Sequence, residues 1–302
     1  NKNRFDKAMV AKSRADYWDA LDSAIDADRA AHGKPLLKPK ERQPEEKETK
    51  ISRTDPDSGY MVRDGKPTGF FYLDHRTVDG RHAIITDTYT TAANVHDSIV
   101  YLGRLDRQRQ RFGFDVKAVG LDAGYATSGI AKGLEDRKIP GVTGYRRPTP
   151  PKPGMLGPKD FIYQDDPEGY VCPQGQLLSY ATTDRNGYRH YKSDPAICRT
   201  CPLLASCTSN AKAERSITRH VWREARERTD ANRLTSWGKA IYKRRKETVE
   251  RSFADAKQLL GHRYARFRGL TGVTCQCLLA ATAQNIKKIA MALTKAPTPS
   301  PA

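Results

Sequence analysis

Apolar residues recur at helical spacing in two parts of the chain. Between Thr235 and Gly261 they form one stripe, which predicts an amphipathic helix that ends at the glycine. A second stripe predicts a long charged helix over residues 5–33. The segment 34–50, rich in proline and charge, is predicted to be a mobile linker, and the proline-rich segment 295–301 a disordered tail.

The run 114–121, which includes Phe114, Val116 and Val119, predicts a strand that ends at Asp122. A turn and a short helix capped by Ser128 follow, and residues 142–145 can return as the next strand. This order predicts a βαβ unit and an α/β fold. Open α/β sheets carry their sites at the carboxyl ends of strands, so Asp122 is a candidate functional residue. An aspartate after a strand is also a common turn residue.

A hairpin is predicted upstream, with strands at 69–78 and 82–86 and the pair Asp79-Gly80 between them. Asp-Gly is favoured in type I′ turns on conformational grounds alone. We therefore interpret Asp79 first as a turn residue and keep a catalytic carboxylate as the alternative. His96, although it precedes an aspartate, is interpreted as a helix-start residue.

Glu250 lies beside the apolar stripe of the helix that begins near Thr235. Lys246 and Lys257, four residues before it and seven after it, are predicted to share its face. A carboxylate between two cations stays ionised, as a metal ligand must be. The alternative is an ordinary solvated ion pair on a helix surface.

The net charge of +18 and the sequence pI near 9.7 indicate a polyanionic partner, which we expect to be bound with a steep salt dependence. Basic residues gather at 242–246 and at 262–268, where Arg266 and Arg268 alternate with aromatic residues. A solvated surface, RNA or lipid headgroups are the alternatives. The sequence carries neither a signal-peptide pattern nor an apolar run long enough for a bilayer, which predicts a cytoplasmic protein without a membrane partner.

Four cysteines stand at metal-ligand spacing: Cys172 in a Cys-Pro-Gln-Gly turn, and Cys198, Cys201 and Cys207 in a C-x2-C-x5-C cluster. They could form a structural Zn²⁺ site with sulfurs about 3.5–4 Å apart, since tetrahedral Zn–S bonds measure about 2.3 Å. Free thiols are the alternative, and a reducing compartment argues against disulfides. The remaining cysteines, at 275 and 277, lie in an apolar helical stretch and are predicted to be small core residues.

Four stretches in this order, TDPDSGY (54–60), TTAANVHDS (90–98), LDAGY (121–125) and KETVERSFADAK (246–257), resemble the DDE transposases of bacterial insertion sequences. The resemblance implies a ribonuclease-H-like core, a mixed sheet with flanking helices, in which three acids hold two Mg²⁺. It makes Asp122 the second acid, Glu250 the third and Lys257 a phosphate contact. Arg245 or Lys246 would be the DNA-binding cation that the family carries shortly before this glutamate.

The resemblance also implies a first acid, in a strand with an Asp-Ala-Thr or Asp-Gly-Thr signature that this chain does not contain. We therefore expect a truncated fragment that is inactive by itself. The implied function is DNA transposition: Mg²⁺-dependent strand cleavage and strand transfer on double-stranded insertion-sequence ends, with self-association in a synaptic complex. A DNA-binding remnant without catalysis and a ribonuclease-H-like nuclease unrelated to transposition are the alternatives.

The expected organisation is a catalytic core interrupted by a cysteine-containing insertion module. Its parts are a charged helix and linker (1–50), the first part of the core (51–145), the four-cysteine module (146–215), the helical remainder of the core with the third acid (216–291), and the tail (292–302).

Overall fold

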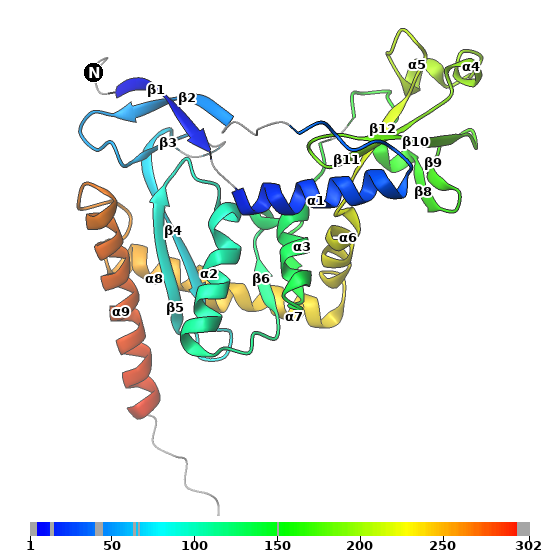
Figure 1. Cartoon of the computed structure of the whole chain (residues 1–302). Coiled ribbons are helices and arrows are strands. Elements are labelled where there is room, and N and C mark those ends of the chain that lie inside the picture. The colour runs from blue at the N-terminus through cyan, green and yellow to red at the C-terminus, as the bar shows by residue number, and fades with distance from the viewer. Residues whose placement is uncertain are drawn as a thin grey trace, which may run out of the picture. The chain divides into compact units, whose positions relative to one another are not determined.

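The computed structural model describes residues 5–12, 15–39, 45–62, 65, 67–149 and 151–294 of the 302-residue chain. They fall into two compact units, each assembled from segments that are distant in sequence. Unit 1 draws its residues from 1–13, 44–144 and 229–302, and unit 2 from 14–43 and 145–228. The described residues form both helices and strands (Figure 1), which confirms the α/β prediction at that level.

The described residues of unit 1 form three separate sheets. The central one is antiparallel, in the order β3-β4-β5, and β6 and β7 form a parallel pair. The strands are β1 (Phe5–Lys12), β2 (Glu45–Ser52), β3 (Gly59–Met61), β4 (Gly69–Val78), β5 (Ile85–Ala92), β6 (Val119–Leu121) and β7 (Gly141–Thr143). The helical elements are α2 (Asp97–Phe112), η1 (Ala123–Tyr125), α3 (Ser128–Asp136), α7 (Ser236–Arg245), the π-turn η3 (Lys246–Glu250), α8 (Arg251–Leu259) and α9 (Leu270–Thr294).

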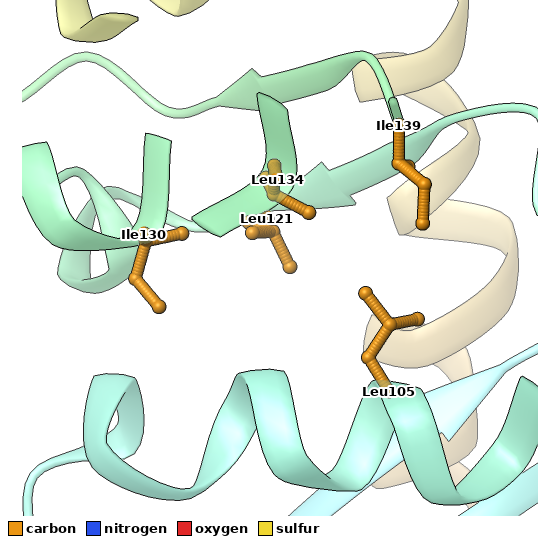
Figure 2. Close-up of a cluster of buried hydrophobic side chains, with 5 residues drawn as sticks. All are labelled: Leu105, Leu121, Ile130, Leu134 and Ile139. Atoms are coloured by element: carbon orange, nitrogen blue, oxygen red, sulfur yellow. The ribbon is translucent and has the colours of Figure 1, made fainter. Parts of the chain in front are cut away.

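The predicted βαβ unit is present as β6, α3 and β7. Its apolar side chains meet one side chain from α2 in a buried cluster, which Figure 2 shows pointing toward a common centre. Burying such side chains contributes roughly 1.5–3 kcal/mol each. The cluster therefore fixes the strand that ends at Asp122 against two helices. Its members are Leu105, Leu121, Ile130, Leu134 and Ile139.

Two strand edges of unit 1 have no partner among the described residues. β3 pairs only with residues 69–71 of β4, so the edge of β4 that faces away from β5 is open over 72–78. The edge of β6 that faces away from β7 is likewise open. Open edges present unpaired N–H and C=O groups, which favour the addition of another strand.

Unit 2 is built on a five-stranded antiparallel sheet in the order β12-β11-β10-β9-β8. Phe161, Leu178 and Tyr191 are buried in its core, and α1 packs through Leu21 and Ile25 against Trp222. Its elements are α1 (Ala15–Ala31), η2 (Pro158–Asp160), β8 (Ile162–Asp165), β9 (Glu168–Val171), β10 (Leu177–Thr183), β11 (Tyr188–Lys192), α4 (Pro195–Cys198), α5 (Leu204–Cys207) and β12 (Ser216–His220); α6 (Arg223–Asn232) begins in unit 2 and ends in unit 1.

Several sequence predictions need correction. The helix expected over 5–33 is a strand, β1, followed by α1, because residues 5–12 pair along their whole length with β2. That pairing also makes residues 45–50 a strand instead of a linker, while 40–44 and the tail 295–302 lie outside the described residues. The strand expected over 114–121 shortens to β6.

The hairpin turn is longer than a two-residue loop. β5 starts at Ile85, and the six residues before it form the connection. The Asp79 carboxylate accepts hydrogen bonds from the backbone nitrogens of Arg81 and His82, at 3.1 and 2.5 Å. The interpretation of Asp79 as a turn residue is therefore confirmed, whereas the type I′ geometry and the partner strand at 82–86 are wrong.

Candidate active site

Asp122 follows β6 directly and is half-buried. One of its carboxylate oxygens, Oδ1, accepts a hydrogen bond from Gly124 N at 2.8 Å and caps the short helix η1. Within the described part of the chain, its second oxygen has no hydrogen-bond partner. A strand-end carboxylate that is held through one oxygen can offer the other to a ligand.

Glu250 closes the π-turn between α7 and α8. In a π-turn the backbone pairs residue i with i+5, so positions five apart come together, and such turns occur frequently at functional sites. Arg245, five residues before the glutamate, accordingly places Nη1 3.6 Å from Glu250 Oε1. The prediction that Lys246 shares a face with Glu250 assumed a regular α-helix. In the π-turn, Arg245 forms the ion pair with Glu250 instead. Lys246 and Lys257 are exposed.

Arg245 also links Glu250 to the end of β6. Its Nη1 donates to the Tyr242 hydroxyl at 3.4 Å, and a Cβ placed at Gly120 would lie 3.5 Å from Arg245 Cγ. A Cβ placed at Gly144 would lie 2.7 Å from that hydroxyl and 2.8 Å from Ala123 N. Glycine is required at 144 because Tyr242 of α7 and the turn after Asp122 both approach this position so closely.

A further acid, Asp97, belongs to the same neighbourhood and was missed by the sequence analysis. It is the first residue of α2, and its Oδ1 lies 3.2 Å from Nδ1 of His75. The pKa of Tyr125 is raised mainly by burial. The negative charges of Asp97 and Asp122 raise it further and the positive charge of Arg245 lowers it, so all three lie near this tyrosine. The sequence signal that could have identified Asp97 is its position at the start of a helix that follows a strand. The prediction for His96 is confirmed, since its Nδ1 caps the same helix.

The helix that follows Glu250 is fastened to the sheet by a buried polar network. Arg76 of β4 donates to Ser252 Oγ at 2.8 Å and lies over the Phe253 ring at 4.6 Å. Ser252 Oγ in turn donates to Gln284 Oε1 of α9 at 3.0 Å. The Arg76 side chain is fully buried and Ser252 is 1% exposed. This network sets the position of the helix that starts next to Glu250.

Asp74, His262 and Cys277 are close enough to share one ion, with one ligand atom each and all three within 4.8 Å. His262 Nε2 lies 3.2 Å from Asp74 Oδ2 and 3.9 Å from Cys277 Sγ. The same Asp74 oxygen also accepts from Arg76 at 2.5 Å. The hydrogen bond to Asp74 raises the pKa of His262 to about 9, so the ring is protonated at neutral pH and donates. A metal fits this set poorly, and an ion pair fits it well.

The four cysteines with zinc-ligand spacing all lie in unit 2. Burial raises the pKa of the Cys207 thiol, and the positive charge of Arg215 opposes this rise. The other three thiols also raise the pKa, so all four cysteines lie near one another. Within the described residues, they do not form a group with sulfurs inside 4.8 Å, so the separation predicted for zinc ligands is not present. Neutral thiols gain little from a closer approach. Of the remaining two cysteines, the one at 277 is a core residue as predicted, and the one at 275 is exposed.

Arg266 and Arg268 are exposed in the connection between α8 and α9, as a role in DNA binding requires. None of the helices in the described part of the chain is long and apolar enough to cross a bilayer.

Residues 171–290 match the sequence profile of a family described as Transposase DDE domain. The matched region contains Glu250 and all four unit 2 cysteines, and Asp122 lies outside it. No curated protein and no solved structure matched the chain.

Proposed function

We propose that the chain is a DDE transposase, as its match over residues 171–290 suggests, and that it acts in the cleavage and strand transfer of insertion-sequence ends. The observation that carries the proposal is the position of Arg245, which pairs with Glu250 and packs against Gly120 of β6, the strand that ends at Asp122. The core around these residues would be ribonuclease-H-like.

Asp122 and Glu250 would hold Mg²⁺, since carboxylate oxygens are the ligands that this hard cation prefers. When bound, a pair of such ions activates a hydroxyl group and stabilises charge on the oxygens of a phosphodiester. The free oxygen of Asp122 and the half-exposed Glu250 side chain fit that role. Arg245 orients Glu250 through their ion pair, because its guanidinium is itself held by Tyr242.

A third carboxylate would complete the metal-binding set of Asp122 and Glu250. Asp79 is an unsuitable candidate because its carboxylate accepts hydrogen bonds from the backbone of its own turn. We propose that the acid is carried by a strand that pairs with the open edges of β4 and β6. The residues described here would then bind DNA without cutting it. Asp97 is the alternative source within unit 1, and Mg²⁺-dependent nicking that is lost in Asp97→Asn would assign it.

DNA binding would rest on the net charge of +18, with Lys246, Lys257, Arg266 and Arg268 as phosphate contacts. The substrate would be double-stranded DNA, bound by self-associated copies in a synaptic complex in the bacterial cytoplasm. Affinity for a labelled duplex should fall steeply as the salt concentration rises. A binding constant that does not change with salt would count against a phosphate-based interface.

Cys172, Cys198, Cys201 and Cys207 would hold a structural Zn²⁺ that closes the turns of unit 2, since ligation to one ion would draw in thiols that already lie near one another. Elemental analysis of the purified chain should give about one zinc per molecule, and Cys198→Ser should lower that value. Full alkylation of all four thiols in the native protein would contradict the site.

Metal binding tests the carboxylate assignment without requiring catalysis. Titration with Mn²⁺, followed by its electron paramagnetic resonance signal, should show weaker binding in Asp122→Asn and in Glu250→Gln. Asp115→Asn is the matched control, because that carboxylate is 78% exposed and, among the described residues, pairs with Lys117 alone. Unchanged Mn²⁺ affinity in both site variants would refute the assignment.

A further inference from the structure

The connection between α8 and α9, residues 262–268, exposes two aromatic side chains. Tyr264 is 79% exposed and Phe267 52%. An aromatic ring left in water forgoes the stabilisation that its burial would give, so such exposure favours a partner that covers the ring. We call this connection the Tyr264 loop.

The backbone of the Tyr264 loop is held at both ends of the exposed segment. Gln276 of α9 donates to Tyr264 O and accepts from Arg266 N, both at 2.9 Å. The next two backbone nitrogens after the loop, at Gly269 and Leu270, donate to the carboxylates of Asp55 and Asp57 at 3.0 and 2.8 Å. The rings are therefore presented by a fixed scaffold, which lowers the entropy cost of binding.

Three arginines share the loop with these rings. Arg263, Arg266 and Arg268 are all exposed, and none forms an ion pair with another described residue. The guanidinium of Arg266 lies over Gly261, where a Cβ would meet it at 2.6 Å. Unpaired guanidinium groups beside exposed rings combine phosphate contact with a stacking surface.

We propose that the Tyr264 loop binds unpaired bases of DNA, with Tyr264 stacked on a base and the loop arginines on the flanking phosphates. This rests on the proposed function and specifies the form of DNA that the site takes. α8 separates the loop from Glu250 by about ten residues, or roughly 15 Å at 1.5 Å per residue. That distance spans a few nucleotides, so the loop would hold strands that have separated near the carboxylates.

The test compares two fluorescent DNAs of equal length, one fully paired and one with three unpaired bases that include 2-aminopurine. Tyr264→Ala should weaken binding of the unpaired DNA about tenfold or more and abolish quenching of 2-aminopurine, because one stacked base contributes about 1–3 kcal/mol. Binding of the paired DNA should stay within about twofold. Tyr264→Phe should retain both signals, since the ring is kept.

Tyr188→Ala is the matched control, an exposed tyrosine of unit 2. Equal affinity of wild type and Tyr264→Ala for the unpaired DNA would overturn the inference, as would equal losses on both DNAs. Salt-dependent binding of the paired DNA by wild type would leave the proposed function intact in either case. A wild type that binds neither DNA would overturn both proposals.

Discussion

The ion pair of His262 with Asp74 should make the stability of unit 1 depend on pH. Burial alone would raise the pKa of Asp74, but His262, Arg76 and Thr88 hold it below its usual value. The pKa of His262 is raised to about 9, mainly by the hydrogen bond to Asp74, from 6.5 in the unfolded chain. The His262 side chain is 11% exposed, so solvent screens this pair little.

The sign follows from proton linkage. A group with a raised pKa binds its proton more tightly in the folded state, so its stabilisation is complete below pH 6.5 and is lost as the pH rises through about 9. At about 1.4 kcal/mol for each tenfold change in proton affinity, the loss is about 3 kcal/mol. The Tyr264 loop begins at this histidine, so its anchoring should weaken over the same range.

Urea unfolding at several values between pH 6 and pH 10 measures this effect. The free energy of unfolding of wild type should fall more steeply above pH 7 than that of His262→Gln, and the difference between the two proteins should shrink by about 3 kcal/mol across the range. His96→Asn, which removes an exposed histidine at a helix cap, is the control. Parallel profiles for wild type and His262→Gln, or an NMR titration of His262 centred below pH 7, would refute the reasoning.

Three substitutions test the packing around the candidate site by urea unfolding. Arg245→Gln should lower the free energy of unfolding by about 1 kcal/mol, because it breaks the contacts to Glu250 and to Tyr242. Lys246→Gln, the control, should change it by no more than about 0.5 kcal/mol. Equal losses in the two variants would contradict the pairing of Arg245 with Glu250 in the π-turn. Gly144→Ala should destabilise by about 1–3 kcal/mol through overpacking, whereas Gly103→Ala, whose Cβ meets nothing within 4 Å, should be neutral or stabilising. Ser252→Ala should cost about 1–3 kcal/mol, since it leaves buried partners unsatisfied; a cost below about 0.5 kcal/mol would show that the network does not hold α8.

Local sequence signals located much of the candidate site. The run 114–121 predicted a strand that ends at the carboxylate of Asp122, and the structure has a strand-end carboxylate there. Gly261 was predicted to end the helix of Glu250, and it adopts the left-handed conformation with φ 67°. Both features depend on the preferences of a few neighbouring residues, which a sequence displays directly.

The features that could not be predicted from the sequence depend on contacts between residues far apart in the chain or on the π-turn, which interrupts the helical period. Residues 5–12 carry a helical pattern yet form β1, because pairing with β2 decides their conformation. Glu250 pairs with Arg245 because a π-turn shifts the helix by one position, which a period of 3.6 residues does not anticipate.

The same holds for α1, which joins unit 2, and for the ion pair of His262 with Asp74. A sequence specifies which side chains can make such contacts, but their energies depend on which partners the folded chain brings within reach. The tertiary structure therefore decided the pairings, while the sequence by itself determined the local elements and the residue types that take part in them.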